Sequence, residues 1–409
     1  MSENSFTEVT SQGWVSRIGS SIKGILFGVF LFLASFFLLF WNEGRTVERT
    51  QTLNEGSGVV VSVDAITLNP ANQEKLIHFS AFVTSDDTLV DKTFDVEAKA
   101  LRLNRKVEIY QWVETSESHS ETAMGGEKTT TTTYSYNKAW KDELKSSGSF
   151  KRPEGHINPN DMPFTKRNLT TDNAKAGAFH LSAAMINKLN KLEAFNLDTN
   201  KPLPKLATKS IHYYGNGFYI GKESNTPQVG DMKVTYSVLK PQDISVVAQQ
   251  QGDTVTTYNT EAGGSIAMIV SGKRSAESMF KQAHKDNVMM MWVLRGVGFA
   301  MMVIGLSMIF MPLSVIADVV PFIGSIVGGG TVVFAVLMAM VLSLVTVAFA
   351  WIFYRPLIGL GLLAIAGGIM WLVKVKFKKN DVATPTTMEK EKAVEERKPD
   401  GAGEYEDGI

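Results

Sequence analysis

The fold is decided by the stretch WVLRGVGFAMMVIGLSMIFM at residues 292–311 and by two similar apolar blocks at 330–354 and 357–373. Each block is close to the roughly 20 residues that a helix needs to cross the hydrocarbon layer of a bilayer. Between residues 288 and 373 only Arg295, Asp318 and Arg355 are charged. A surface helix of a water-soluble protein keeps a polar face, and these blocks have none. The C-terminal part of the chain is therefore predicted to be a bundle of membrane helices.

The bulk composition excludes several classes of function. Lys and Arg together number 41, and so do Asp and Glu, so no basic excess indicates binding to nucleic acid. Cysteine is absent from all 409 residues, which removes disulfides, thiolate metal sites and cysteine nucleophiles. We therefore expect no nucleic-acid partner and no thiol chemistry.

A further apolar block, GILFGVFLFLASFFLLFW, lies at residues 24–41. It is longer than the apolar core of a secretory signal peptide and ends in bulky aromatic residues, so we expect an uncleaved anchor at 22–41. The polar residues 1–21 before it are expected to form a cytoplasmic arm. Gly24 and Gly28 form a small-xxx-small pair that either lets another helix approach closely or reflects the general use of glycine in membrane helices.

The fold class predicted from these blocks is a membrane α-helical protein with four spans, one N-terminal and three C-terminal. The three C-terminal spans are expected at 288–312, 328–354 and 356–373. The segment 313–327 is too short to cross; it is either interfacial or re-entrant, or it continues the preceding span beyond a kink. The polar tail, 374–409, is expected to be disordered in the cytoplasm.

Residues 42–287 have the composition of a water-facing region and are predicted to form a large β-rich α+β domain. Alternating apolar residues predict strands at 59–63, 75–83, 105–114 and 233–239. Residues 107–140 are expected to form two long strands around Gly125 and Gly126, with a threonine run on the returning strand. Helical periodicity is expected at 178–195 and again at 275–287, just before the second span.

Charged residues beside the spans predict the topology. Four spans place both termini on one side, and Arg17, Lys23 and the lysines from 374 to 379 assign that side to the cytoplasm. The β-rich domain is then expected outside the cytoplasm, in a periplasm or lumen. Trp41 and Trp292, together with Trp351, are expected at the outer interface, where aromatic residues form a belt.

No group of residues has the pattern of a catalytic, cofactor or metal site. The histidines are scattered without metal-ligand spacing, and the serine-hydrolase and P-loop motifs are missing. Arg295 and Asp318 are candidates for a transport pathway. A charge inside a span costs about 2.5–3.5 kcal/mol on insertion scales, so such residues often have a function. Arg295 is expected to reach the headgroups from near its helix end, and Asp318 lies too far away to be its partner.

Motifs along residues 14–373 resemble the transmembrane protein 43 (LUMA) family. The shared motifs are RIGSSIKG at 17–24, FWNEGR at 40–45, YQWVE at 110–114, YSYNKAW at 134–140, PQVGD at 227–231, SAESMF at 275–280, WVLR at 292–295, LSVIADVVP at 313–321 and YRPL at 354–357. Lys138 and Ala139 depart from the family pattern, in which an acidic residue usually precedes the tryptophan, and the tail matches nothing.

The resemblance and the membrane interfaces together draw attention to one set of residues. They are Trp41, Asn42, Glu43, Gly44, Arg45, Trp292, Arg295, Asp318, Pro321, Arg355 and Pro356. The resemblance implies one span, a large lumenal or periplasmic domain, three further spans and no enzymatic activity. In animals the family is found in the endoplasmic reticulum and inner nuclear membrane and oligomerises. The chain itself is expected in a bacterial inner membrane, with the animal locations applying if it is eukaryotic.

The function expected is membrane or envelope organisation, or scaffolding. The expected partners are membrane lipids, further copies of the chain and unidentified membrane or envelope proteins. The alternative is a small channel or transporter that uses the C-terminal three-span bundle. A third hypothesis, an envelope hydrolase or lipid-modifying enzyme, requires a pocket lined by facing Asp, Glu or His residues.

Overall fold

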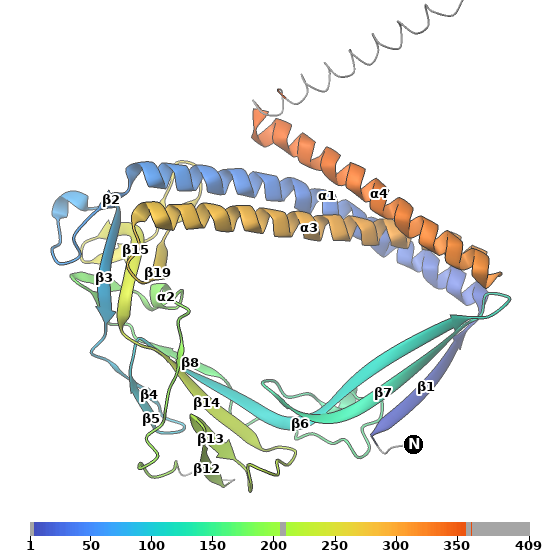
Figure 1. Ribbon diagram of the computed structural model, residues 1–409, viewed down its shortest axis with the longest axis horizontal. Coiled ribbons are helices and arrows are strands. Elements are labelled where there is room, and N and C mark those ends of the chain that lie inside the picture. The colour runs from blue at the N-terminus through green and yellow to red at the C-terminus, as the bar shows by residue number, and fades with distance from the viewer. Residues whose placement is uncertain (1–3, 205–209, 357–360, 362–409) are drawn as a thin grey trace, which may run out of the picture. The chain divides into compact units, whose positions relative to one another are not determined.

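The computed structural model describes residues 4–204, 210–356 and 361. Two β-sheets and three long helices dominate this part of the chain (Figure 1). The sheets are built almost entirely from residues between the first two long helices, as the composition of 42–287 predicts. The predicted combination of apolar helices with a β-rich region is confirmed.

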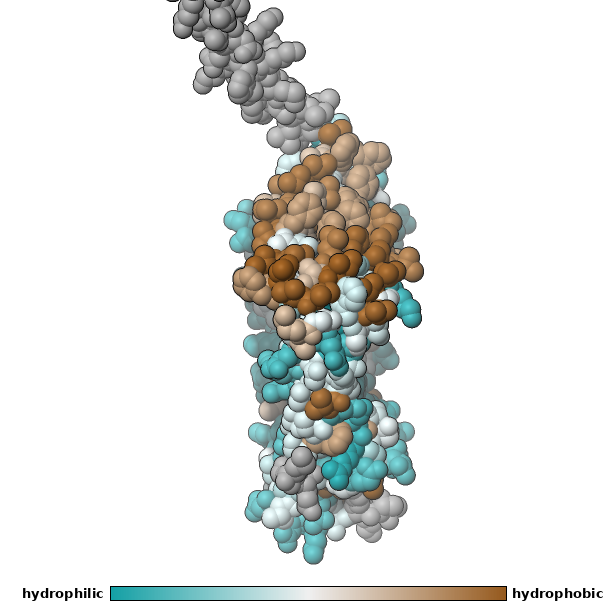
Figure 2. Space-filling view, turned by 90° about the vertical axis from the view of Figure 1, so that its right-hand side faces the viewer, coloured by the Kyte–Doolittle hydropathy of each residue, from teal (hydrophilic) through white to brown (hydrophobic). Residues whose placement is uncertain are grey.

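Three described helices are long and apolar enough to cross a membrane. They are α1 (Trp14–Val59), α3 (Ala276–Ala317) and α4 (Pro321–Tyr354). Figure 2 shows hydrophobic side chains gathered over the helices, whereas the β-rich part is mostly hydrophilic on the face in view. Four spans are therefore not supported by the described residues, since the predicted fourth span, 356–373, lies outside them apart from residues 356 and 361.

Helix α1 is much longer than the predicted anchor at 22–41. It begins at Trp14 and continues past Trp41 to Val59. The extension is polar in sequence, but Thr46, Thr52, Leu53 and Gly56 are buried on one face of it. Packing against the β-rich region therefore determines where α1 ends, and the length of the apolar block does not.

The segment 313–327 is divided between two helices. Helix α3 passes Pro312 and ends at Ala317, and α4 begins at Pro321 after a short turn. The segment is therefore not a separate element: the alternative of a continued helix holds as far as Ala317, and the remaining residues belong to the turn and to α4. Proline has no backbone N–H, and the N–H groups of the first helical residues have no intrahelical partner. Proline is therefore well suited to the start of a helix, which explains why α4 begins at Pro321.

The larger sheet is antiparallel along the strand order β1-β7-β6-β14-β13-β12. Two further strands pair at its side, β8 with β6 and β11 with β14. The strands are β1 (Ser5–Gln12), β7 (Lys128–Lys141), β6 (Arg102–Thr122), β14 (Met232–Leu239), β13 (Gly217–Ile220), β12 (Ile211–Tyr214), β8 (Arg167–Thr170) and β11 (Glu193–Ala194). Apolar residues between this sheet and the neighbouring hairpin of β4 (Thr88–Asp91) and β5 (Val96–Lys99) form one core, which includes Phe94, Val107, Phe218 and Val234.

The predicted pair of long strands at 107–140 is confirmed by β6 and β7. Their register runs from Ile109 opposite Lys141 to Thr122 opposite Lys128. Gly125 and Gly126 form the turn with φ values of +91° and +79°, which favour glycine. We call the part of this hairpin between residues 111 and 139 the arm. Strand β1 adds a third strand to the arm by pairing with β7. The sequence predicts no strand within residues 1–21.

The second sheet closes on itself, because β15 pairs with both β3 and β16 while β16, β10, β9 and β3 pair in succession. Strands β19 and β2 extend it. The strands are β19 (Met268–Ser271), β15 (Gln242–Gln251), β16 (Thr254–Thr256), β10 (Phe179–Leu181), β9 (Ala174–Ala176), β3 (Leu76–Thr84) and β2 (Val61–Ser62). Phe79 and Phe179 stack in its core with ring centroids 4.4 Å apart.

The helix predicted at 178–195 is wrong. This stretch contains β10, the four-residue helix α2 (Ala183–Ile186) and β11. Phe179, Ile186 and Leu189 recur at helical spacing in the sequence, yet they are buried in the core of the closed sheet from separate elements. By contrast the helix predicted from Ser275 is present as the start of α3, where the Ser275 side chain caps the N–H of Ser278.

Short elements complete the described chain. They are the hairpins β4 (Thr88–Asp91) with β5 (Val96–Lys99) and β17 (Tyr258–Asn259) with β18 (Ser265–Ile266), and the 3₁₀ turns η1 (Pro70–Asn72) and η2 (Ser147–Ser149). The predicted strands at 75–83, 105–114 and 233–239 correspond to β3, β6 and β14. The strand predicted at 59–63 is reduced to β2, because α1 occupies its first residue.

Helices α1 and α3 lie side by side along most of their length (Figure 1). At Gly28 and Gly305 their backbones touch: a Cβ added to Gly28 would lie 2.9 Å from the Gly305 oxygen, and one added to Gly305 would lie 2.8 Å from the Gly28 oxygen. The small residues in the span therefore serve a contact within the chain. Because the nearest atom on the partner helix is in each case a backbone oxygen, no flexible side chain can move aside to make room for an added Cβ.

Replacing Gly305 by valine should force the two helices apart. Overpacking of a tight contact costs about 1–3 kcal/mol, so the Gly305→Val protein should unfold at a lower temperature in detergent. The matched control is Gly296→Val on the same helix, because a Cβ at Gly296 meets nothing within 4 Å. Equal melting temperatures for the two variants, measured by the loss of helical circular dichroism, would contradict the close contact.

Candidate functional site

A buried ion pair joins α1 and α3 just beyond the apolar block of α1. The Nε and Nη2 atoms of Arg295 donate to the two carboxylate oxygens of Glu43 at 2.7 and 2.9 Å. The Glu43 side chain is 1% exposed and the Arg295 side chain 15%. Two parallel hydrogen bonds between a guanidinium and a carboxylate fix both distance and orientation. This pair therefore sets the register of the two helices.

Amide side chains continue the polar contact beside the ion pair. The Asn42 side chain donates to the carbonyl of Met291 at 3.1 Å, and the Asn287 side chain donates to the carbonyl of Thr46 at 3.0 Å. Asn42 and Asn287 are 0% and 5% exposed. Each helix thus contributes one amide that bonds the backbone of the other. We call Asn42, Glu43, Thr46, Asn287 and Arg295 the polar seam.

Two tryptophans mark the same end of the helix pair as the polar seam. Trp41 precedes Asn42 on α1, and Trp292 follows Met291 on α3; they are 47% and 62% exposed. The Arg295 guanidinium also lies 4.9 Å from the centre of the Trp292 ring. Gly44 and Arg45 continue α1 beyond this point. Large exposed indole rings at one level of a helix pair are typical of a membrane–water interface.

A second ion pair lies at the opposite end of the helix pair. Arg17, near the start of α1, bonds the carboxylate of Asp318 in the turn between α3 and α4, and both side chains are largely buried. The Asp318 carboxylate also lies against Gly324 in the first turn of α4. A negative charge is stabilised at a helix N-terminus, so the Asp318 carboxylate complements the start of α4. Pro321 begins that helix, and Arg355 and Pro356 follow its end.

The structure therefore gives partners to both charges that the sequence places in the spans. As expected, Arg295 and Asp318 do not pair with each other. The expectation that Arg295 simply extends to the headgroups is corrected, because its guanidinium binds Glu43 on α1. The partners Glu43 and Arg17 were missed. The available signal was that each lies beside an end of the apolar block 24–41, where an antiparallel partner helix brings its own ends.

Other family-motif residues have structural roles within the larger sheet. The Gln111 side chain is fully buried and bonds Glu143 and Lys145, which holds the loop after β7 against the sheet. Lys138 lies over the ring of Trp112 with Nζ 4.6 Å from the ring centre. These contacts explain the motif residues without a ligand.

Three buried tyrosines of that sheet each donate a hydrogen bond to a carboxylate. The pairs are Tyr136 with Glu114 at 2.8 Å, Tyr219 with Asp231 at 2.6 Å and Tyr236 with Asp91 at 2.8 Å. Burial and the adjacent carboxylate raise the pKa of Tyr136 to about 12. The same two causes raise the pKa of Tyr219 and of Tyr236. All three phenols are therefore held in the protonated form, as hydrogen-bond donors that connect strands.

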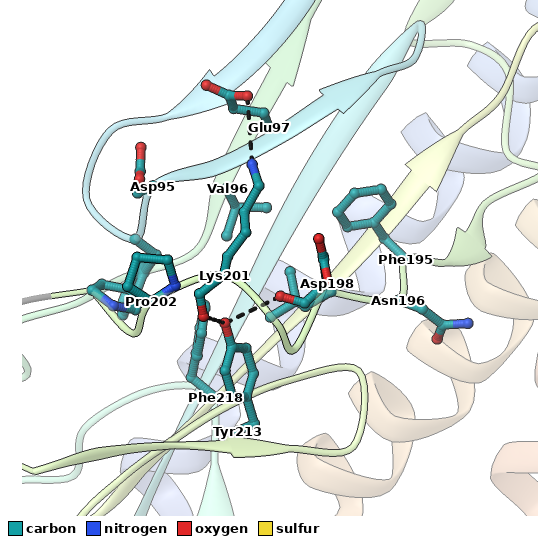
Figure 3. Close-up of a pocket in the computed structure, with 13 residues that line it drawn as sticks. Asp95, Val96, Glu97, Phe195, Asn196, Asp198, Lys201, Pro202, Tyr213 and Phe218 are labelled. Carbon is teal, nitrogen blue, oxygen red and sulfur yellow. Dashed lines mark hydrogen bonds and ion pairs between the residues drawn. The ribbon is translucent and has the colours of Figure 1, made fainter.

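The β-rich region contains a surface pocket of about 210 Å³ next to the β4–β5 hairpin (Figure 3). Asp95, Glu97 and Asp198 contribute carboxylates to its lining. Glu97 is 3.7 Å from the Lys201 amine, and Asp198 accepts hydrogen bonds from Asn200. All three acidic residues are exposed to water. The pocket thus lacks a buried acid–base pair.

Within residues 4–204, 210–356 and 361, no group of three or more His, Cys, Asp or Glu residues is arranged to hold a metal ion. The His119 side chain is 80% exposed on the arm beside Glu121. His156 is packed between the rings of Tyr136 and Trp112. These two histidines are thus occupied by structural contacts or by water.

Comparison with known proteins assigns the family. A family model described as transmembrane protein 43 matches residues 109–356. Transmembrane protein 43 of Mus musculus is 34% identical over 396 residues, which cover 92% of this chain and 97% of that protein. The Homo sapiens protein is 34% identical over 358 residues (84% of this chain, 88% of that protein), and the Drosophila melanogaster homolog 27% over 365 residues (85% and 94%). The chain belongs to the transmembrane protein 43 family.

Membership of the transmembrane protein 43 family confirms the resemblance found in the motifs. These relatives come from animals, so a eukaryotic membrane fits the chain and the expectation of a bacterial inner membrane has no support. No solved structure matches the chain.

Separate replacement of Glu43 by glutamine or Arg295 by glutamine should destabilise the helix pair strongly. Removing one partner of a buried ion pair leaves the other charge buried alone, which costs about 3–5 kcal/mol. The double variant should recover much of this loss, because neither charge then remains. Chemical unfolding in detergent, followed through a double-mutant cycle, measures the coupling.

The matched control for that cycle is the exposed pair Lys106–Glu108, whose side chains are 59% and 27% exposed. Exposed pairs couple by less than about 1 kcal/mol. A coupling at Glu43–Arg295 no larger than this control would show that the pair does not set the helix register.

The protonated state of Tyr136 should make stability fall at high pH. The unfolded side chain ionises near its model value of 10.0, whereas the folded one ionises at about 12. The stabilisation is thus complete below pH 10 and is lost as the pH rises from 10 to 12. Alkaline unfolding curves should show a shallower loss over this window for Tyr136→Phe than for the parent protein. Identical slopes would contradict a raised pKa.

Proposed function

We propose that this transmembrane protein 43 family member organises membranes as a scaffold and has no enzymatic activity of its own. The spans would assemble with further copies of the chain, and the β-rich region would bind protein or lipid partners. Its site of action would be a eukaryotic membrane of the endoplasmic reticulum or nuclear envelope, as the family resemblance implies. The observation that carries the proposal is the rigid connection between the helix pair and the β-rich region.

That connection is a small core shared by the helices and the closed sheet. It contains Leu53 of α1 and Met279 and Phe280 of α3, packed on Leu76, Val247 and Ile266. All six side chains are at most 4% exposed. A Cβ added to Gly56 of α1 would meet the Cδ1 methyl group of Ile266 and the ring of Phe280, so the packing there is tight. A partner bound to the β-rich region would therefore be held at a fixed position relative to the membrane helices.

The surface available for self-association is the outward face of the helices. The small residues Gly28 and Gly305 are used within the chain, so they are not free to bind a second copy. Leu26, Phe30, Leu33 and Phe37 recur every three or four residues on α1 and are 60–78% exposed. In a membrane these side chains contact either lipid or another copy. A scaffold requires that some of them contact another copy.

No contact among the described residues favours the alternative function, a channel or transporter. Its motivation was the presence of Arg295 and Asp318 in apolar helices. Both charges are compensated by an ion pair with α1, and the two pairs lie at opposite ends of the helices. The α1–α3 contact between them is formed by Leu39, Met302 and Leu306, which are apolar. We therefore retain scaffolding as the proposed function.

The assembly half of this proposal is testable with purified full-length protein in mild detergent. We expect a protein mass, after correction for bound detergent, above the 44.9 kDa of one chain. The double variant Phe30→Ala and Phe37→Ala should reduce the assembled fraction, because both rings lie on the outward face. The matched control is Phe36→Ala, whose ring packs into the helix core. A parent protein that is strictly monomeric would exclude self-association.

A further inference from the structure

A pocket of about 310 Å³ lies between the helix pair and the closed sheet, next to the polar seam. Arg49 of α1 and Lys188, which follows α2, contribute cationic side chains to its lining. Asp286 and Asn287 of α3 contribute a carboxylate and an amide, and residues 268–270 of β19 form a further side. Asn287 also belongs to the polar seam, so we call this cavity the seam pocket.

The seam pocket contains charges of both signs that do not neutralise each other. Arg49 and Lys188 each donate to a backbone carbonyl at 2.8 Å, and Asp286 accepts a hydrogen bond from the Gln282 amide at 2.8 Å. In the part of the chain that the structure describes, no ion pair joins any of these three charges to another residue. A ligand that complements the pocket should therefore carry an anionic group for the two cations and a cationic group for Asp286.

The seam pocket lies close to the level of phospholipid headgroups. Arg49 follows the interfacial Trp41 by eight residues, and Asp286 precedes the interfacial Trp292 by six. At 1.5 Å per helical residue, the two charges lie about 12 and 9 Å beyond the tryptophans. The headgroup layer is roughly 5–8 Å deep, and the long stem of an arginine extends across the difference. A headgroup can therefore enter the pocket while its acyl chains remain in the bilayer.

The walls of the seam pocket also suit a small amphipathic group. Ile269 of β19 and Met279 of α3 line it and are 7% and 4% exposed. Such apolar side chains pack against methylene groups and exclude water, which strengthens charge interactions beside them. The volume lies at the lower end of the range for small-molecule sites, roughly 300–1,000 Å³. It is thus sized for a headgroup and not for a whole lipid.

We propose that the seam pocket binds the headgroup of phosphatidylethanolamine. The phosphodiester lies against Arg49 and Lys188, and the ammonium group lies against Asp286. This inference rests on the lipid-binding part of the proposed function and names the lipid class. A bound headgroup contacts α1, α3 and the closed sheet together, so it reinforces the connection between the helices and the β-rich region.

The chemistry of the two ends of this headgroup distinguishes it from related ligands. A guanidinium binds phosphate oxygens through parallel N–H donors, which any phospholipid satisfies equally. The ethanolamine ammonium, like that of a lysine side chain, has three N–H donors for the Asp286 carboxylate. The quaternary ammonium of choline has no N–H donor, and inorganic phosphate has no cationic end. Binding should therefore be strongest for phosphatidylethanolamine.

The first test compares ligands on purified full-length protein in mild detergent. The protein is titrated separately with dioctanoyl phosphatidylethanolamine, dioctanoyl phosphatidylcholine, phosphoethanolamine and inorganic phosphate, and its melting temperature is followed by circular dichroism. A ligand that binds the folded state raises this temperature. We expect phosphatidylethanolamine to act at about tenfold lower concentration than phosphatidylcholine, because one charge-assisted hydrogen bond is worth at least that factor. Equal action of the two lipids, or of either water-soluble phosphate compound, would overturn the proposal.

The second test assigns the two ends of the headgroup to their residues. Arg49→Gln should raise the concentration needed of both lipids about tenfold, because the phosphodiester loses its guanidinium. Asp286→Asn should abolish the preference for phosphatidylethanolamine and leave the response to phosphatidylcholine unchanged. The matched control is Lys285→Gln, because Lys285 is an exposed neighbour of Asp286 that does not line the pocket.

Each variant is compared with its own melting temperature without lipid, so a change in folding stability does not mimic a change in binding. Asp286 is exposed, so Asp286→Asn should fold even if Arg49→Gln does not. A preference for phosphatidylethanolamine that survives in Asp286→Asn would overturn the proposal. The protein mass of the same samples reports self-association separately. An assembled protein without lipid preference would therefore refute this inference alone, and a monomer with the preference would refute only the self-association in the proposed function.

Discussion

The structure depends on the antiparallel contact between α1 and α3. Backbone atoms meet at Gly28 and Gly305, which brings the helices closer than larger side chains would allow. Apolar association alone leaves two such helices free to slide, because lipid is as apolar as their side chains. The ion pairs Glu43–Arg295 and Arg17–Asp318 remove this freedom by fixing both ends. One contact thus positions every element attached to the helices.

The charges of the helix pair have a structural explanation that needs no transported ion. Glu43 and Arg295 satisfy one another with two hydrogen bonds, and Arg17 and Asp318 pair at the other end. Buried ion pairs contribute little net stability relative to apolar residues, but they specify one arrangement over its alternatives. For the scaffold proposed above, the register of the two helices matters more than added stability.

Much of the fold was predictable where the determining interactions are local in sequence. The apolar blocks, the hairpin around Gly125 and Gly126 and the cap at Ser275 all carry their signals within a few residues. The helix wrongly predicted at 178–195 shows the limit of periodicity, because Phe179 and Ile186 are buried from different elements. Strand β1 was missed because a short polar strand gains its stability from pairing with β7, more than a hundred residues away.

The candidate site was only half predictable for the same reason. Glu43 and Arg295 were each singled out by their motifs, yet 252 residues separate them and only the α1–α3 register brings them together. The end of α1 had no local signal either. Residues 42–59 are polar, and α1 continues through them because Leu53 and Gly56 pack on the closed sheet. Pairing and packing between distant segments are what a single sequence does not display.

The length of α1 explains why the polar seam lies where it does. Its 46 residues extend about 69 Å at 1.5 Å per residue, more than twice the thickness of the hydrocarbon layer. The part beyond Trp41 must be covered by protein, and the core around Leu53 and Phe280 covers it. The polar seam lies at the boundary between these two environments, next to Trp41 and Trp292. Asn42, Glu43 and Arg295 therefore join α1 to α3 at the point where the apolar part of the helix pair gives way to the part covered by the closed sheet.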